Sequence, residues 1–248
     1  MSLLATDAIV LHAFDYRETS RILRLATREA GVQSVIARGA RRAKGGPGAG
    51  LDLFTSGRAQ WMVRPGRDLH TLITFDATHA RSALAADLGR FHGAAALAEL
   101  LLRFTPEDAA DTVFAALERS LDALVIADRA SVEAEAIAAC WALIGELGFA
   151  PALEHCAACQ AELSPDDDLI FHHRAGGALC ARCARATPGG RILPAAARAV
   201  LIAWRDGERP VLPDATHAKA HRRLLREFLQ EHLEDGRPLR AFRAWDAR

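Results

Sequence analysis

Four cysteines provide the clearest chemistry in the sequence. Cys156 and Cys159 form one CxxC pair, and Cys180 and Cys183 form a second pair further along the chain. Two such pairs supply four thiolates, which is a ligand set of structural zinc sites. The sequence therefore predicts one structural zinc ion per chain, with a closed coordination sphere. Two disulfides are the alternative, but nothing at the N-terminus resembles a signal peptide, and a reducing cytosol disfavours disulfides.

Other polar residues near the cysteines are expected to have simpler roles. His155, His172 and His173 are interpreted as polar loop residues, and the three aspartates at 166–168 as a polar turn. Cys140 lies on the apolar face of a predicted helix and is expected to be a buried small hydrophobe. The sequence has no phosphate-binding loop, nucleophile elbow or HExxH motif, so no catalytic site is predicted.

Basic residues gather in and around a glycine-rich loop over residues 39–50, where no regular structure is expected. Such a loop can follow a phosphate chain, and phosphate contacts dominate the affinity of nucleic-acid binding. A neighbouring strand and turn carry further arginines, which a barrel could gather into one groove with the loop. Solvated loop charge is the simpler alternative. The predicted DNA contacts are Arg38, Arg41, Arg42, Lys44, Arg58, Arg64 and Arg67.

Aromatic residues and a second basic stripe add to this hypothesis. Tyr16, Phe54 and Trp61 are candidates for stacking on bases, although Phe54 and Trp61 fit a protein core equally well. The last long helix carries basic residues at i, i+3, i+4 and i+7, which form one stripe that either binds DNA or an acidic partner or is only solvated. This possible second basic face consists of Lys219, Arg222, Arg223 and Arg226.

The charge balance agrees with a local polyanion site. The 248 residues contain 31 basic and 31 acidic side chains, and this neutrality alone argues against a nucleic-acid partner. Divided along the chain, however, residues 1–80 carry a net charge of +4 and residues 81–150 carry −6. Residues 151–190 carry −2 and residues 191–248 carry +4. Basic ends on either side of an acidic middle hint at a polyanion partner for the ends.

Residues 5–76 are predicted to form about five short strands and hence a small antiparallel barrel. Leu23 and Leu25 share one face of their strand, and the segment 58–64 alternates so that Ala59, Trp61 and Val63 share another. After a turn at 65–68, one further face is predicted to consist of Leu69, Thr71, Ile73 and Phe75.

Helical periodicity then begins, and it predicts an α+β multidomain protein. One helix is expected over 84–102, another from a strong start signal at Thr105-Pro106-Glu107-Asp108, and a third from Ser131 to Gly148. A long helix follows, capped by Asp214 and ending at Gly236. The predicted domains are a barrel over 1–79 and a helical domain over 80–248, with a zinc-binding insert at about 152–190.

Several strings of residues resemble the RecO family of bacterial recombination-repair proteins. In the N-terminal part they are Tyr16-Arg17-Glu18-Thr19, Thr27-Arg28-Glu29-Ala30-Gly31 and Ala37-Arg38-Gly39-Ala40-Arg41-Arg42. The resemblance resumes at Gly148-Phe149-Ala150-Pro151 and at Gly176-Gly177-Ala178-Leu179-Cys180. Family members commonly follow the Arg-Arg pair with a Lys-Ser run, where this chain has Ala43-Lys44-Gly45. Residues 80–135 match in pattern only.

The resemblance implies an N-terminal OB-fold, a helical second domain and an inserted zinc knuckle. It also implies a non-enzymatic mediator of the RecF pathway that binds single- and double-stranded DNA and anneals complementary strands. With RecR, such a protein assists RecA in displacing single-strand-binding protein, whose acidic tail it also binds. Carried over by position, the DNA contacts are Arg38, Arg41, Arg42 and Lys44.

Two other functions remain open from the residues alone. One is a zinc-dependent hydrolase in which a knuckle cysteine is not a ligand and water fills the fourth position. The other is an OB-fold RNA-binding factor. Since no apolar run is long enough to span a membrane, the expected location is the cytoplasm, with nucleoid association when DNA is bound.

Overall fold

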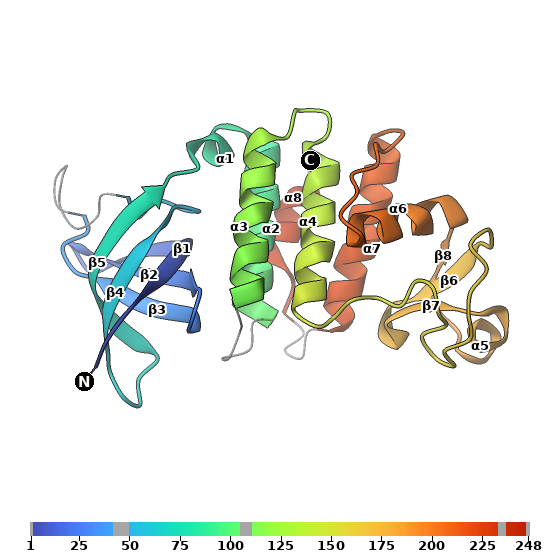
Figure 1. Cartoon of the computed structure of the whole chain (residues 1–248), viewed down its shortest axis with the longest axis horizontal. Coiled ribbons are helices and arrows are strands. Elements are labelled where there is room, and N and C mark those ends of the chain that lie inside the picture. Colours follow the sequence, from blue (N-terminus) through green and yellow to red (C-terminus); the bar gives the residue numbers. More distant parts are fainter. Residues whose placement is uncertain (1, 42–49, 105–110, 233–236, 247–248) are drawn as a thin grey trace. The chain divides into compact units, whose positions relative to one another are not determined.

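The computed structural model describes residues 2–41, 50–104, 111–232 and 237–246. The predicted contacts Arg42 and Lys44, the helix start at 105–108 and the helix end at Gly236 lie outside these ranges. The chain divides into two compact units, Met1–Ile126 and Ala127–Arg248 (Figure 1). The domain boundary expected at 79/80 marks the change from strands to helices and stays a prediction. Among the described residues, no helix is long and apolar enough to cross a membrane.

Five strands in the first unit form a closed barrel in the order β1-β2-β3-β5-β4. They are β1 (Ser2–Tyr16), β2 (Ser20–Thr27), β3 (Gly31–Ala37), β4 (Ser56–Val63) and β5 (Leu69–His79). Strands β3 and β5 pair in parallel, and the other neighbours, including β1 with β4, pair in antiparallel. This order and size are those of the OB-fold. The α+β class with an OB-like first part is thus confirmed.

The barrel closes around the side chains that the alternating pattern selected. Leu23, Leu25 and Ala59 are fully buried, and Trp61 is almost so. Leu51 from the segment before β4 and Val35 from β3 complete the centre of this core. A sequence in which small and large apolar residues alternate with polar ones can therefore close a sheet around an apolar core.

The predicted apolar face of β5 is wrong. Leu72, not Thr71 or Ile73, packs in the barrel core, and Ile73 is 51% exposed. The pairing of β4 with β5 shifts by one residue between Gln60 and Trp61. Such a bulge adds one residue to a strand and reverses which alternate side chains face inward. Phe75 lies beyond the bulge and again packs against the core, as predicted.

Three helices complete the first unit. They are α1 (Ser82–Ala86), α2 (Leu88–Phe104) and α3 (Asp111–Ile126), and the single helix expected over 84–102 is in fact two. Asp87 has an extended backbone between α1 and α2, and its carboxylate accepts a hydrogen bond from the backbone N–H of Arg90 at 2.9 Å. The Asp87 side chain thus caps the N-terminus of α2, and its extended backbone ends α1.

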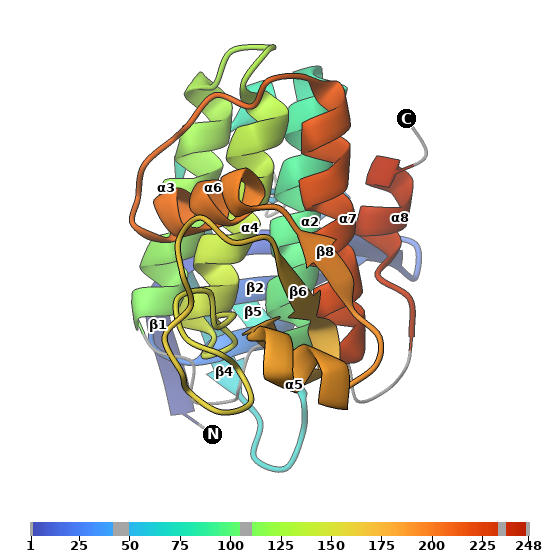
Figure 2. The same cartoon turned by 90° about the vertical axis from the view of Figure 1, so that its right-hand side faces the viewer.

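The second unit contains a helical group and a small sheet (Figure 2). The helices are α4 (Val132–Glu146), α6 (Ala195–Arg205), α7 (Ala215–Glu231) and α8 (Arg240–Asp246). The Asp214 cap of α7 is confirmed, since its carboxylate accepts from the N–H groups of Thr216 and His217. The sequence did not predict α8, whose Phe242 and Trp245 are buried.

The insert lies between α4 and α6. It comprises β6 (Leu169–His172), the short helix η1 (His173–Ala175), β7 (Gly177–Leu179), α5 (Ala181–Ala186) and β8 (Arg191–Leu193). The three strands form an antiparallel sheet in the order β7-β6-β8. Phe171 of β6 packs edge-on against Phe228 of α7, with 5.8 Å between ring centroids. The insert is thereby anchored to the helices of its own unit.

Candidate nucleic-acid interface and metal centre

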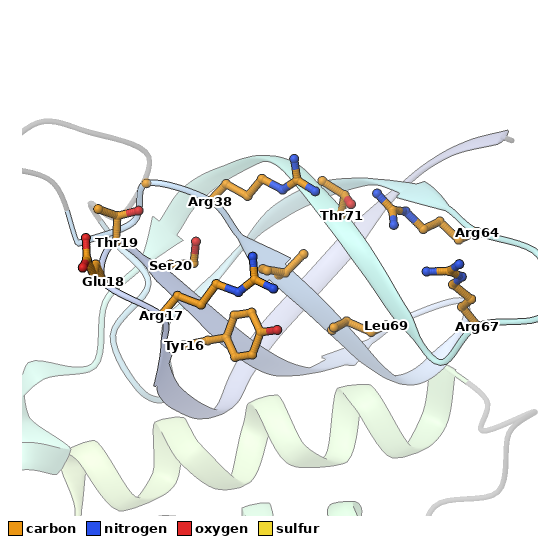
Figure 3. A pocket seen from close by; sticks show the side chains of 12 residues that line it. Tyr16, Arg17, Glu18, Thr19, Ser20, Arg38, Arg64, Arg67, Leu69 and Thr71 are labelled. Atoms are coloured by element: carbon orange, nitrogen blue, oxygen red, sulfur yellow. The ribbon is translucent and has the colours of Figure 1, made fainter.

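A groove of about 1050 Å³ lies on the outside of the barrel. Ile36 of β3 and Leu69 and Thr71 of β5 form its floor (Figure 3). Its two ends are the turn between β1 and β2, residues 17–19, and the turn between β4 and β5, which carries Arg64 and Arg67. The strand face bounded by these two loops is where OB-folds bind oligonucleotides and oligosaccharides.

Four arginines line this groove. Arg38, Arg64 and Arg67 were predicted from the sequence, and the barrel brings them together. The turn before β5 is closed by a hydrogen bond from the Arg67 N–H to the Arg64 carbonyl, 3.2 Å long, so both side chains project from one tight loop. Four guanidinium groups around one groove form a site for a chain of phosphates.

Arg17, the fourth groove arginine, was not among the predicted contacts. Its backbone lies in the left-handed region, with φ of 53°, at the β1–β2 turn. The guanidinium carbon lies 5.3 Å from the centre of the Tyr16 ring, as in a cation–π contact. A turn signal between two strands could have identified this residue. The backbone N–H of Arg41 donates to the Thr19 carbonyl at 3.1 Å and links the segment after β3 to the β1–β2 turn.

Two predicted contacts lie elsewhere on the barrel. Arg58 pairs with Asp7 at 3.2 Å, opposite it on β1, and does not line the groove. Arg41 pairs with Asp15 at 3.5 Å and is also absent from the groove lining. Of the predicted contacts that the structure describes, Arg38, Arg64 and Arg67 therefore share one groove. Whether any of these residues contacts DNA stays a prediction.

The structure places the three aromatic candidates for base stacking in two different environments. Tyr16 lines the groove, whereas Trp61 and Phe54 are buried, at 1% and 3% exposure. Phe54 packs edge-on against Phe91 of α2, with 6.0 Å between ring centroids. Trp61 and Phe54 therefore belong to the core, which was the simpler of their two interpretations, and only Tyr16 remains a stacking candidate among the three.

The basic stripe on α7 is largely engaged in ion pairs. Arg222 is buried and contacts both Glu133 of α4 and Asp246 of α8. Arg226 also pairs with Asp246, and Arg223 pairs with Glu227 at 2.9 Å. Lys219 and Arg223 are the exposed members of the stripe. Arg222 and Arg226 hold α7 to its neighbouring helices, and contact of the stripe with DNA stays a prediction.

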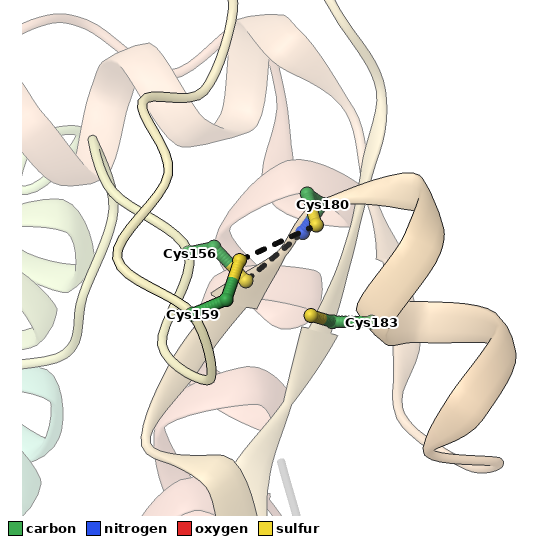
Figure 4. A group of neighbouring side chains, drawn as sticks. All are labelled: Cys156, Cys159, Cys180 and Cys183. Atoms are coloured by element: carbon green, nitrogen blue, oxygen red, sulfur yellow. Dashed lines mark hydrogen bonds between the residues drawn. The ribbon is translucent and has the colours of Figure 1, made fainter.

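The four predicted zinc ligands converge at one place (Figure 4). All four sulfur atoms lie within 4.8 Å of one another, and those of Cys159 and Cys180 are 3.8 Å apart. Tetrahedral Zn–S bonds of about 2.3 Å place sulfur atoms about 3.8 Å from each other, so the donor set fits a zinc ion. Because all four thiols are present, no coordination position is left for water. This geometry disfavours the hydrolase alternative.

Hydrogen bonds from backbone N–H groups change the pKa of a thiol in this cluster. Burial raises the pKa of the Cys156 thiol, but N–H groups of Cys180, Ala158 and Cys159 outweigh this effect and lower that pKa to about 6. Hydrogen bonds with Cys159 and Cys180 raise the pKa of Cys183 to about 12. Because only thiolates bind a divalent ion, binding of zinc would displace the protons that the thiols carry.

The two glycines before the second knuckle have a structural role. Gly176 has φ of 81° and ends η1, and Gly177 has φ of 156°. A Cβ atom on Gly177 would lie 2.3 Å from the Ala152 carbonyl oxygen, so no other residue fits there. This close approach brings the strand after Gly177, and Cys180 at its end, next to the first knuckle.

The nearby histidines and aspartates are not part of the cluster. The group of potential metal ligands found among the described residues contains the four cysteines alone. His172 accepts a hydrogen bond from the Ala175 N–H, and His173 lies 3.3 Å from Glu227. Asp168 accepts from the Ala195 N–H at the start of α6, as expected of a polar turn. Cys140 is fully buried, and burial raises its pKa.

Comparison with known families and proteins gives consistent matches over nearly the whole chain. The family model "Recombination protein O N terminal" matches residues 1–81, and "Recombination protein O C terminal" matches residues 85–241. A protein of Anaeromyxobacter sp. (strain K) named "DNA repair protein RecO" is 34% identical, with 99% of this chain and 97% of that protein covered. A protein of the same name from Thermobifida fusca is 31% identical, with 95% and 96% covered.

Proposed function

Since the chain belongs to the RecO family of DNA repair proteins, we propose that it is a non-enzymatic recombination mediator. In this proposal it binds single- and double-stranded DNA, anneals complementary strands and, with RecR, assists the loading of RecA onto DNA coated with single-strand-binding protein. The observation that carries the proposal is the arginine-lined groove on the oligonucleotide-binding face of the barrel.

The groove has the properties that phosphate binding requires. Arg64 and Arg67 border it at one end, while Arg17 and Arg38 border it at the other, so the positive charge extends along its length (Figure 3). Guanidinium groups bind phosphate oxygens in pairs, and each neutralised phosphate releases counterions. Neutralising the phosphates of two strands also reduces their mutual repulsion, which favours annealing. Arg41, Arg42, Lys44 and Arg58 stay proposed as further DNA contacts.

The cysteine cluster is proposed to bind one structural zinc ion. Cys156, Cys159, Cys180 and Cys183 would hold it, and the ion would link the loop after α4 to the start of α5. Zinc bound by four thiolates contributes folding energy and offers no open position for substrate. Because the four thiols must stay reduced to bind the ion, the proposed location is the cytoplasm, at the nucleoid when DNA is bound.

RecR and the tail of single-strand-binding protein are proposed as protein partners, with RecA linked functionally through the DNA. These proposals rest on family membership, and no described groove is assigned to either protein. The four positions of the α7 stripe remain candidates for a second DNA contact, with Lys219 and Arg223 as the exposed cations among them.

The proposal is tested by removing charge from the groove. We expect Arg38→Ala, Arg64→Ala and Arg67→Ala, combined, to weaken binding of a fluorescent single-stranded oligonucleotide and to slow annealing. A matched control combines Arg191→Ala, Arg205→Ala and Arg209→Ala, which removes three arginines that form ion pairs and do not line the groove. Since surface ion pairs contribute little to stability, the control should fold normally. Equal loss of binding in both variants would contradict the groove assignment.

The same binding measurement separates DNA from RNA. An unlabelled oligonucleotide of either sugar type competes with the fluorescent DNA for the groove. The proposal predicts that DNA displaces the probe at least as well as RNA of identical sequence. A clear preference for RNA would instead support an OB-fold RNA-binding factor.

A further inference from the structure

Three ring-bearing residues follow one another on the outer face of β1. His12, Phe14 and Tyr16 alternate along the strand, while Ala13 between them packs against the barrel core. Side chains two residues apart in a strand point to the same side of the sheet, so the three rings face outward together. Tyr16 lines the groove, and Phe14 is 44% exposed although it is a large apolar side chain.

Neighbouring strands extend this face into the groove. Phe14 pairs with Ile22 of β2, and Ile22 pairs with Ile36 of β3. Ile36 belongs to the groove floor. A continuous apolar row therefore runs across three strands, from an exposed aromatic ring to a groove whose ends carry arginines.

Arg24 lies on the same face, one row away. Its strand neighbours are His12 on β1 and Ser34 on β3. The Nε atom of Arg24 is buried and has no hydrogen-bond partner among the described residues. An unpaired buried donor is costly, so the Arg24 guanidinium gains by turning toward a ligand that supplies an acceptor.

We infer that the outer face of β1, β2 and β3 is a stacking platform on which Phe14 and Tyr16 receive unpaired bases of a single strand. Arg38, Arg64 and Arg67 hold the phosphates of that strand, and Arg24 donates to a base edge or a phosphate above the platform. This inference rests on the proposed function. It adds that the protein recognises the unpaired bases of the DNA as well as its phosphates. An apolar row beside a positive rim matches the two chemical faces of a single strand, which are flat bases and charged phosphates.

The platform gives the groove a preference for strands with exposed bases. In a duplex the bases stack on one another, and their flat faces are unavailable to protein side chains. Phosphate contacts, in contrast, are offered by single and double strands alike. Loss of the rings should therefore weaken binding of single strands only, whereas loss of the groove arginines should weaken binding of both.

Two substitutions test this difference. We expect Phe14→Ala and Tyr16→Ala each to weaken binding of a single-stranded oligonucleotide about 5- to 150-fold, the range for loss of one base–aromatic stack. Duplex affinity should stay within about twofold of wild type. Tyr16→Phe keeps the ring and should bind normally. Leu3→Ala is the matched control, since Leu3 is an exposed apolar residue at the other end of the same strand.

Photo-crosslinking locates the bases directly. An oligonucleotide carrying 5-iododeoxyuridine forms covalent links mainly with aromatic rings that stack on the halogenated base. We expect the linked peptides to contain Phe14 or Tyr16, and Tyr16 is the only tyrosine in the chain. Links confined to other peptides would overturn the inference, and so would normal single-strand affinity of both alanine variants.

Failure of the inference is distinguishable from failure of the proposed function. If wild-type protein binds single strands and the groove arginine variant does not, while Phe14→Ala and Tyr16→Ala bind normally, only the platform is wrong. If wild-type protein shows no salt-dependent binding of any DNA, the proposed function itself is wrong. Equal losses for single and double strands in the ring variants would assign Phe14 and Tyr16 to the integrity of the barrel.

Discussion

At the scale of single residues, the thiol cluster depends on each of its four members. The Sγ atom of Cys159 lies 3.8 Å from that of Cys180, and Cys159 is one of the two proposed ligands from the first CxxC pair. We expect Cys159→Ser to lose most of the zinc, because a hydroxyl is a poor ligand for this ion. The measurement is zinc released per chain by a colorimetric chelator. Cys140→Ala is the control, since Cys140 lies outside the cluster and should retain about one zinc per chain.

A buried histidine should make folding stability depend on pH. Burial, aided by the charge of His217, lowers the pKa of His221 to about 4. The ring packs against Trp204 with 4.8 Å between centroids, and its Nδ1 has no hydrogen-bond partner among the described residues. Between pH 6.5 and 4 the unfolded chain binds a proton at His221 that the folded protein does not bind. Stability therefore falls as the pH falls through this window.

We expect this histidine alone to remove about 2 kcal/mol from the free energy of unfolding between pH 7.5 and pH 5. Urea unfolding at the two pH values measures the loss for wild type and for His221→Gln. The substituted protein should lose less stability over the same interval. An identical loss in both proteins would show that His221 is not buried in its neutral form.

Residue types and spacing predicted the cysteine cluster more fully than the groove. Four cysteines at CxxC spacing have few other uses in a reducing compartment, so all four members of the cluster were identified. Arginines have many uses, and Arg58 and Arg64 look alike in an alternating strand. Only the pairing of β1 with β4 shows that Arg58 lies opposite Asp7 and is neutralised there. Arg17 was missed because its place in the groove depends on the turn between two strands.

At the scale of elements, one close approach holds the insert together. Gly177 begins β7, and its backbone lies against that of Ala152, to which it is bridged. We expect Gly177→Ala to destabilise the protein by more than about 2 kcal/mol, since the added methyl group would overlap the Ala152 backbone and the φ of 156° is strained for alanine.

Urea unfolding followed by circular dichroism tests this expectation. Gly145→Ala is the control, because Gly145 lies within α4 and a Cβ atom there meets nothing within 4 Å. Alanine is the better helix former, so the control should be as stable as wild type or up to about 1 kcal/mol more stable. Similar stability of the two variants would mean that β7 can move away from Ala152.

The sequence predicted the type of most elements and missed features that depend on pairing. Alternation identified the strands, and the Asp214 cap identified the start of α7. The β5 face was assigned wrongly because a bulge is visible only against the partner strand β4. The short α8 was missed because its seven residues are too few for a periodic signal, and its stability comes from burying Phe242 and Trp245.

At the scale of the whole molecule, zero net charge means that no long-range positive field attracts DNA. The basic groove and the cysteine cluster belong to different compact units, since the groove lies before residue 126 and the cluster after residue 127. In the proposed function, attraction to DNA is therefore local to the groove, and local attraction is screened by salt within about 10 Å at 0.1 M. Composition alone could not predict this, because opposite charges cancel over the chain.

The most direct test of the groove is the salt dependence of single-strand affinity, measured by fluorescence anisotropy for wild type and for the variant with Arg38, Arg64 and Arg67 changed to alanine. Each phosphate neutralised on a single strand contributes about −0.7 to the slope of log K against log salt concentration. We predict a slope for the variant that is shallower than wild type by about 2, with weaker binding at low salt. Equal slopes for the two proteins, or no wild-type binding at low salt, would contradict the assignment of DNA binding to this groove.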